Sequence, residues 1–330
     1  MQEFFLQVHI TNRCNLRCVH CYGSAQEPRD LSLDEFRRVT EQLISLTQLL
    51  APQRRWIQLT GGEPLLNPGF QRMMEFAVEH VGSVRLLSNG FSIDQSAATR
   101  FAELRVSVQL SFDGLRENHD RWRGDGAFDA ALRAAEILRS AGVRVVARMT
   151  VSRANQDDIL PLCDLLRERT DLFSVARVVP IGDCEAGAQP DVEVYRRALY
   201  GLYGRRLEGE RISLREPFFG PIIAVDQPDT RFEGCSAGRT GLTVLENGDV
   251  LPCRRLPIVL GNVLTDDLAG IYFGHPLLRA LRERNLDGRC GVCEDKRRCG
   301  GARCIANALN GNPLSEDPGC IFHVSRREEP

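Results

Sequence analysis

The chain has 330 residues, of which 43% are hydrophobic and 26% charged, with a formal net charge of −2. A chain of this length is sufficient for one large α/β barrel, or for a barrel-sized domain with a smaller appendage. The mixed charges leave no electrostatic footprint for a nucleic acid, and no apolar run approaches the roughly 20 residues that span a bilayer. We therefore expect neither a nucleic-acid nor a membrane partner.

Cysteines are abundant, at 12 in the chain, and the N-terminal segment lacks the features of a secretion signal, which predicts a cytoplasmic protein. Cytosolic thiols stay reduced, so clustered cysteines there usually bind metal or take part in chemistry. Only Cys163 and Cys184 lie apart from two groups. The groups are Cys14, Cys18 and Cys21, and then Cys235, Cys253, Cys290, Cys293, Cys299, Cys304 and Cys320.

In chain order, six β-branched or apolar runs are each followed by a helical stretch or a loop, which predicts a parallel sheet with helices outside it. Ser32 is placed to cap the first helix and Gly142 to end the fourth. The spacing predicts an α/β fold with a partial (β/α)6 TIM-like barrel rather than eight complete units. The expected strands are 5–11, 55–61, 83–90, 106–114, 143–151 and 173–182, and the expected helices are 31–46, 67–81, 93–104, 128–142 and 156–169.

The pattern loosens after residue 185. We interpret residues 186–232, with one helix expected at 192–207, as a bridge between two domains. The segment 233–330 is rich in Gly and Cys. It contains a hairpin signal at Asn247-Gly248 and a helix signal near 276–284. The expected domains are thus 1–185, 186–232 and 233–330.

The segment CNLRCVHC places Cys14, Cys18 and Cys21 directly after the first predicted strand. Loops at the carboxyl ends of strands carry the active sites of parallel barrels. Three thiolates can ligate three irons of a [4Fe–4S] cluster and leave the fourth iron open to a substrate. A zinc site with His20 as fourth ligand is the competing interpretation.

Two further motifs end predicted strands. In Gly61-Gly62-Glu63-Pro64, the glycines permit a close backbone approach to a ligand, and Glu63 is an acceptor suited to an ammonium group. A simple turn is the alternative interpretation of this motif. Asp113, in the SFDG motif, is more readily explained as a turn former than as a ligand.

These motifs together resemble the signature of the radical S-adenosylmethionine (SAM) superfamily: CxxxCxxC, GGEP at 61–64, Ser88-Asn89-Gly90 and SFDG at 111–114. The resemblance implies that GGEP contacts the SAM amino group, that Ser111 contacts SAM, and that His20 lies near the adenine. We also expect Arg148, a polar residue in an otherwise apolar strand, near this pocket. The expected cofactor-binding residues are His20, Gly61, Gly62, Glu63, Asn89, Ser111 and Arg148.

The C-terminal cysteines resemble the SPASM domain, which binds auxiliary iron–sulfur clusters. By the family's ligation, Cys290, Cys293, Cys299 and Cys320 hold one cluster, and Cys235, Cys253 and Cys304 the other. Ala302 stands near a position that is Cys in many members, so we expect one or two auxiliary clusters, the second with only three obvious thiolates.

That second site can have an open iron, a non-Cys ligand, Cys184 as fourth ligand, a [2Fe–2S] cluster, or no cluster. Zinc is the competing metal, because Cys-x2-Cys followed by two more thiols is also a zinc-ribbon pattern. Cys163 lies in an apolar helical stretch and is better explained as a buried small hydrophobe.

The resemblance implies reductive cleavage of SAM to a 5′-deoxyadenosyl radical that abstracts hydrogen from a substrate, with a flavodoxin- or ferredoxin-type electron donor. A peptide or amino-acid-like substrate is our first hypothesis. The chain starts directly at a strand, which favours either a separate peptide-recognition protein or the second hypothesis, a non-peptide metabolite such as a porphyrinoid, sugar or antibiotic precursor. The third is a non-enzymatic iron–sulfur or zinc protein. Arg148 and Arg177 are both candidates for binding a carboxylate.

Overall fold

The computed structural model describes residues 2–23, 27–182, 184 and 186–322. Its first half alternates strands and helices, as expected. The strands are β1 (Glu3–His9), β2 (Arg54–Thr60), β3 (Val84–Ser88), β4 (Ser107–Ser111), β5 (Val145–Val151) and β6 (Leu172–Arg177). The helices are α1 (Leu33–Leu50), α2 (Phe70–Val81), α3 (Gln95–Glu103), α4 (Arg116–Arg123), α5 (Ala127–Ser140) and α6 (Ile159–Leu166), with 3-10 turns η1 (Pro64–Leu66) and η2 (Gln156–Asp158).

The second half is mainly helical and has short strands. Its strands are β7 (Gly241–Val244), β8 (Asp249–Leu251) and β9 (Gly261–Asn262). Its helices are α7 (Val192–Leu207), α8 (Phe219–Asp226), α9 (Leu268–Gly274), α10 (Pro276–Glu283), α11 (Gly288–Val292) and α12 (Arg303–Asn310), with 3-10 turns η3 (Ala186–Ala188) and η4 (Glu294–Arg297).

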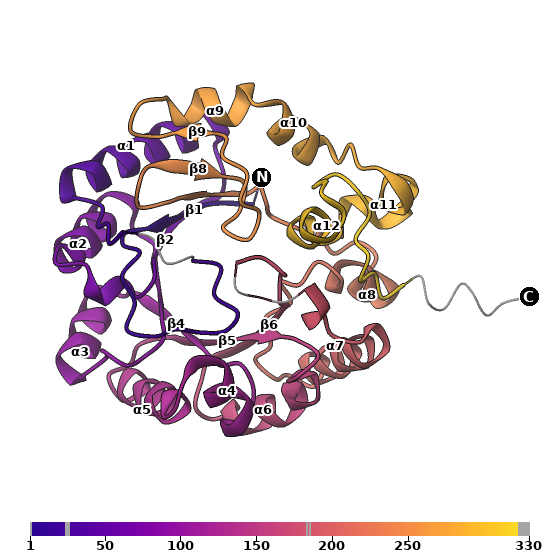
Figure 1. Ribbon diagram of the computed structural model, residues 1–330, viewed down its shortest axis with the longest axis horizontal. Helices are drawn as coiled ribbons and strands as arrows, with labels where there is room; N and C mark the ends of the chain where they lie inside the picture. The colour runs from indigo at the N-terminus through magenta and orange to yellow at the C-terminus, as the bar shows by residue number, and fades with distance from the viewer. Residues whose placement is uncertain (1, 24–26, 183, 185, 323–330) are drawn as a thin grey trace, which may run out of the picture.

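One sheet organises the molecule, in the order β6-β5-β4-β3-β2-β1-β7-β8-β9. The pairs from β1 to β6 are all parallel, and Figure 1 shows helices α1, α2, α3, α5, α6 and α7 around the outside of these strands. This arrangement confirms the predicted partial barrel. Because the strands are parallel, the loops that follow β1 to β6 all emerge at one edge of the sheet.

The C-terminal hairpin extends the same sheet. Strand β7 lies parallel to β1, with Leu242 opposite Leu6 and Val244 opposite Val8. The hairpin turns at Asn247-Gly248 as predicted, and Gly248 has a φ of 91°, which a side chain would disfavour. The sheet thus continues across the expected domain boundaries at 185 and 232, and the division into three domains stays a prediction.

The side chains of β1 to β6 alternate between two faces. Phe4, Leu6 and Val8 of β1 are fully buried in the core beneath the outer helices. The intervening positions face inward and are mostly polar, as Gln7 and Gln58 illustrate at paired positions of β1 and β2. The inner face is therefore suited to polar ligands rather than to further apolar packing.

Residues 211–213 run beside β6, since the amide of Phe173 donates to the Arg211 carbonyl and that of Ser213 to the Phe173 carbonyl. In Figure 1, α8 and α12 lie on the β6 side of the barrel, while α9 lies beside α1 and α10 follows α9. Gln42 fixes the latter contact: its Nε2 donates to the Val263 carbonyl at 2.8 Å, and its Oε1 accepts from the Leu268 amide at 2.6 Å. The C-terminal third thus lies between the two ends of the barrel.

Local signals explain several helix ends. Ser32 caps α1, as the sequence predicts, and it forms a reciprocal capping box with Glu35.

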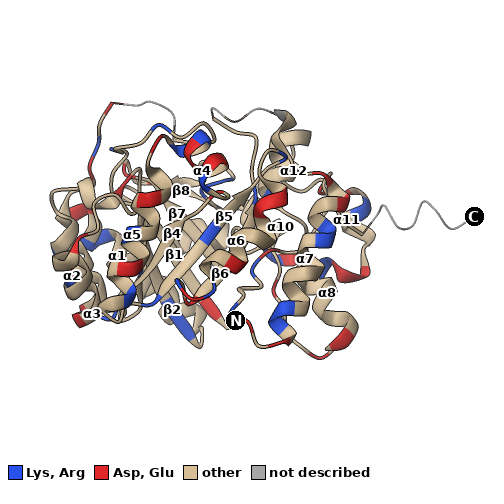
Figure 2. Ribbon diagram, turned by 90° about the horizontal axis from the view of Figure 1, so that it is seen from below, with Lys and Arg blue, Asp and Glu red and all other residues tan. Residues whose placement is uncertain are grey.

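Lys/Arg and Asp/Glu residues are interspersed along the elements in Figure 2. Within the described ranges, no helix is both long and apolar enough to cross a bilayer.

Candidate functional site: two groups of cysteines

The loop after β1 carries Cys14, Cys18 and Cys21, and all three are half-buried. Backbone amides point at two of the sulfurs: Leu16 donates to Cys14 Sγ and Gly23 to Cys21 Sγ, each at 3.4 Å. Burial raises the pKa of Cys18 to about 11 against the opposing effect of Arg123, and Asp113, Cys21 and Cys14 contribute to the rise. The three thiols therefore lie within electrostatic range of one another.

Gly61 and Gly62 hold this loop against the end of β2. A Cβ on Gly61 would overlap the Thr11 carbonyl, and one on Gly62 would overlap the Arg13 carbonyl. The Gly62 amide donates to Thr11 at 2.9 Å and the Glu63 amide to Arg13 at 2.7 Å. The close approach predicted for these glycines is thus made to the cysteine loop, and their contact with SAM stays a prediction.

Glu63 is fully buried and joins the ends of β2 and β3. Its carboxylate accepts from Ser88 Oγ at 3.0 Å and from the Asn89 amide at 2.9 Å. Burial raises the pKa of Glu63 to about 7, although the bonds from Asn89 and Ser88 oppose the rise. Asn89 in turn donates from Nδ2 to Asn15 Oδ1 at 2.8 Å, so the β3 end also contacts the cysteine loop. The role of Glu63 toward an ammonium group stays a prediction.

His20 belongs to the same loop, directly before Cys21, and is only 7% exposed. Its Nε2 lies 3.1 Å from an Asp113 carboxylate oxygen, and its ring packs on Trp122 at a centroid distance of 4.7 Å. Its Nδ1 is buried and has no hydrogen-bond partner among the described residues. A buried ring nitrogen without a partner fits a ligand such as an adenine at this position.

Asp113 is a structural anion rather than only a turn former. It accepts from Arg123 Nε at 2.6 Å and from the Thr150 amide at 2.8 Å. Burial alone would raise the pKa of Asp113, but Arg123 and His20 hold it well below its usual range. Arg123 also reaches toward Cys18 Sγ, with 4.0 Å between Nη1 and sulfur. Sequence reasoning missed Arg123, and the signal available was its position in the HDRWRG segment.

The donor set fits an iron–sulfur cluster and SAM. In the part of the chain that the structure describes, no three His, Cys, Asp or Glu side chains are arranged as a ready metal site. The sulfurs nonetheless share one locality and accept amide hydrogen bonds, a setting known to tune iron–sulfur clusters. Cys14, Cys18 and Cys21 would hold a [4Fe–4S] cluster there, beside the unpartnered nitrogen of His20.

Several C-terminal cysteines lie near one another, and their assignment to two clusters stays a prediction. Burial raises the pKa of Cys304 to about 12. Arg255 opposes this rise, whereas the thiols of Cys253 and Cys235 contribute to it. Cys304 is therefore near those two thiols.

In the other group, burial raises the pKa of Cys299, and Cys320 and Cys290 contribute to the rise. The amide of Cys235 donates to the Cys299 carbonyl at 3.0 Å, which joins the two groups through the backbone. Cys293 ends α11, three residues after Cys290.

Buried arginines fix this region. Arg177, 2% exposed at the end of β6, pairs with Asp317 at 2.6 Å and with Glu216 at 3.4 Å. Asp317 also accepts from the Ala302 amide at 2.7 Å. Arg303 is fully buried, donates to the Ser315 carbonyl at 2.5 Å, and lies 3.6 Å from Cys290 Sγ. Arg177 is thus a support of the cysteine-rich region.

Ser111 and Arg148 are neighbours on the inner face of the sheet, because they are Cα partners in the β4–β5 pairing. Cys184 follows Gly182, whose backbone packs against Cys21 and Tyr22. The segment before Cys184 also packs against the other group, since Val179 and Ile181 share an apolar cluster with Cys304 and Cys253. The role of Cys184 as an auxiliary ligand stays a prediction.

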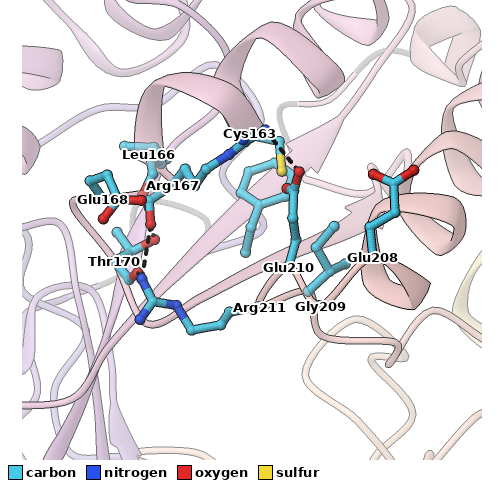
Figure 3. Close-up of a pocket in the computed structure, with 11 residues that line it drawn as sticks. Cys163, Leu166, Arg167, Glu168, Thr170, Glu208, Gly209, Glu210 and Arg211 are labelled. Atoms are coloured by element: carbon cyan, nitrogen blue, oxygen red, sulfur yellow. Dashed lines mark hydrogen bonds and ion pairs between the residues drawn. The ribbon is translucent and has the colours of Figure 1, made fainter.

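A surface pocket of about 390 Å³ lies elsewhere, between α6 and residues 208–212 (Figure 3). Its lining includes Cys163, Thr170 and Phe173, which places it at the amino end of β6. The cysteine loop follows the carboxyl end of β1, at the opposite edge of the parallel sheet. Cys163 is 3% exposed within the apolar core, in line with its interpretation as a small hydrophobe.

Comparisons with known proteins agree with this geometry. The radical SAM superfamily model matches residues 8–166, and the SPASM iron-sulfur cluster-binding domain model matches residues 235–299. The AdoMet-dependent heme synthase of Methanosarcina barkeri is 28% identical over 96% of each chain. The mycofactocin maturase MftC of Mycobacterium ulcerans is 30% identical over 94% of this chain and 86% of that protein.

Solved structures share the fold. Streptococcus suis SuiB bound to its precursor peptide SuiA matches with a TM-score of 0.75 at 18% identity, over 96% of this chain and 76% of that chain. The anSMEcpe structure with bound AdoMet and Kp18Cys peptide matches with a TM-score of 0.76 at 20% identity, over 98% of this chain and 95% of that chain. Taken together, these matches place the chain in the radical SAM superfamily, as an enzyme of [4Fe–4S] clusters and SAM that carries a C-terminal SPASM domain.

Proposed function

We propose that the protein abstracts a hydrogen atom from a peptide or amino-acid-like substrate. When bound, the cluster and SAM supply the chemistry, which is reductive cleavage of SAM to a 5′-deoxyadenosyl radical. The observation that carries the proposal is the meeting of the cysteine loop, the Gly61-Gly62 turn and His20 at the carboxyl edge of the sheet. Active sites of parallel barrels form at this edge.

The chain's own residues hold the cysteine loop in place and orient the side chains around it. Glu63 ties the ends of β2 and β3 so that Asn89 can contact the cysteine loop. Asp113 fixes both His20 and Arg123, which puts a buried positive charge beside Cys18. We infer that this arrangement positions SAM between His20 and Ser111.

A peptide substrate is supported by the mycofactocin maturase relatives and by the fold shared with SuiB in complex with its precursor peptide. We infer that a flavodoxin- or ferredoxin-type protein supplies the electron and that a separate recognition protein delivers the peptide.

The second candidate is a porphyrinoid metabolite. The observation that favours it is the heme synthase relative, which aligns over 96% of both chains. The mostly polar inner face of the sheet is compatible with either substrate.

One experiment tests the chemistry and then the substrate. The anaerobically reconstituted enzyme is incubated with SAM and dithionite, and 5′-deoxyadenosine is measured by mass spectrometry. We expect SAM cleavage, and its absence would refute the proposal. Deuterium transfer into 5′-deoxyadenosine from a deuterated peptide, but not from deuterated Fe-coproporphyrin III, would favour the peptide, and the reverse result would favour the porphyrinoid.

A further inference from the structure

Two arginines on neighbouring strands have different surroundings. Arg177 of β6 is 2% exposed, and its guanidinium is occupied by Asp317 and Glu216. Arg148 of β5 is half-buried and donates from Nη1 to Ser174 Oγ at 2.5 Å. Across the described ranges, no carboxylate lies within ion-pair distance of Arg148. Of the two candidates for binding a carboxylate, only Arg148 has a guanidinium available.

The position of Arg148 is that of a substrate contact. Its Cα partners are Ser111 on β4 and Ser174 on β6, and residues paired in a parallel sheet share one face. Ser111 is the serine expected to contact SAM. Arg148 therefore lies beside the expected cofactor, on the inner face of the sheet.

The auxiliary site lies on its other side. Arg255 acts electrostatically on Arg148 and on the thiols of Cys304 and Cys253. Its Nη1 donates to the Arg177 carbonyl at 3.3 Å, which fixes it at the end of β6. A group bound by Arg148 would thus lie between SAM and the three-thiolate site.

The surrounding charges do not balance. Four guanidinium groups, those of Arg148, Arg177, Arg215 and Arg255, lie near two carboxylates, those of Glu216 and Asp317. Arg177 pairs with both carboxylates, and Arg215 pairs with Glu3. Among the described residues, Arg148 is therefore left without a paired carboxylate. Burial, and then repulsion by Arg255, lower the pKa of Arg148 to about 10.

Tyr195 of α7 is a second, independent observation. It is 1% exposed, and its hydroxyl is buried without a hydrogen-bond partner in the part of the chain that the structure describes. The Arg177 guanidinium carbon lies 5.9 Å from the centroid of its ring, and Glu216 and Arg148 act on it electrostatically. A buried hydroxyl without a partner is rare, and a ligand that accepts a hydrogen bond would satisfy it.

We propose that Arg148 binds a carboxylate group of the substrate and that the Tyr195 hydroxyl donates to the same anion. A planar guanidinium matches a carboxylate through two parallel hydrogen bonds. The inference rests on the proposed function, and it moves Arg148 from the cofactor to the substrate. Peptides and porphyrinoids both carry carboxylates, and amidated probes of each kind distinguish the two sources.

The test measures binding by the reconstituted enzyme and its Arg148→Gln, Arg148→Lys and Tyr195→Phe variants. The probes are Fe-coproporphyrin III against its tetra-amide, and the SuiA peptide with a free against an amidated C-terminus. Arg144→Gln is the matched control, because Arg144 is exposed and directly precedes β5. SAM affinity and 5′-deoxyadenosine formation without substrate are measured in parallel.

In Arg148→Gln we expect the affinity for one acid probe to fall about tenfold or more, with the neutral probe unaffected. Arg148→Lys should retain part of the affinity, Tyr195→Phe should lose less, and Arg144→Gln should match the wild type. The inference would be overturned if the wild-type enzyme bound the acid and amide probes equally well, or if Arg148→Gln bound the acid probe as tightly as the wild type. Weaker SAM binding with unchanged acid binding would return Arg148 to the cofactor. If the wild-type enzyme does not cleave SAM, the proposed function is refuted instead.

Discussion

The two cysteine-rich regions hold their thiols in different ways. Cys14, Cys18 and Cys21 lie half-buried on a loop without regular structure, positioned by backbone contacts with glycines such as Gly62 and Gly182. The C-terminal thiols include the buried Cys299 and Cys304 and are surrounded by buried arginines. A site expected to admit SAM is thus left accessible, whereas two thiols expected to hold clusters permanently, Cys299 and Cys304, are enclosed in a region fixed by a buried ion pair.

The largest expected effect is at the loop. Cys18→Ala should reduce 5′-deoxyadenosine formation to background, because the expected cluster loses one of three thiolates. Cys163→Ala is the control, since it removes a thiol from the apolar core. It should leave iron content and SAM cleavage unchanged. Equal loss in both variants would show that thiol removal acts through stability.

The enclosure of the C-terminal region depends on Arg177. Arg177→Met leaves Asp317 buried without its partner and should destabilise the fold by about 3–5 kcal/mol, as urea denaturation would measure. The exposed pair Arg289–Glu316 gives the control, because Arg289→Met should cost less than about 1 kcal/mol. Similar losses of unfolding free energy in both variants would contradict the difference between the buried and the exposed ion pair.

The auxiliary sites should differ from each other. In the Cys14/Cys18/Cys21→Ala variant, we expect about one eighth of the Mössbauer area of two four-iron clusters to come from an iron without a thiolate ligand. That iron should belong to the site of Cys235, Cys253 and Cys304, and added cyanide should perturb it alone. Two fully Cys-ligated [4Fe–4S] clusters would refute this expectation.

The smallest effect concerns Arg303. Hydrogen bonds to cluster sulfurs influence the reduction potential, and Arg303 is 3.6 Å from Cys290 Sγ. Arg303→Gln should therefore make the potential of that cluster more negative by tens of millivolts in an EPR redox titration. Arg284→Gln serves as the control, because Arg284 donates to the carbonyls of Glu233 and Cys235. A potential that moves equally in both variants would assign the effect to general charge loss.

Local sequence patterns predict several elements of the fold correctly. The helix expected at 192–207 matches α7, and the Asn247-Gly248 turn lies where it was predicted. The cysteine groups were also separable by spacing. Helix α4 was missed, because its sequence RENHDRWR is polar and buries only His119 and Trp122, so no apolar period marks it.

Contacts between distant residues could not be predicted. Arg177 and Asp317 are 140 positions apart, and only the fold brings them together. Periodicity likewise identified Arg148 and Arg177 as polar residues in apolar strands. It could not show that Arg177 pairs with carboxylates, whereas Arg148 pairs with none among the described residues. The carboxylates that distinguish them, Glu216 and Asp317, lie 39 and 140 positions beyond Arg177.

The pairing of β1 with β7 bears on how the protein is made. About 230 residues separate the two strands, and at 5–20 residues per second a ribosome needs roughly 10 to 50 seconds to synthesise them. Throughout that time one edge of β1 has no strand beside it, and an open edge can pair with other chains. We expect nascent chains stalled before residue 241 to aggregate or to recruit chaperones, and slightly longer ones to become soluble.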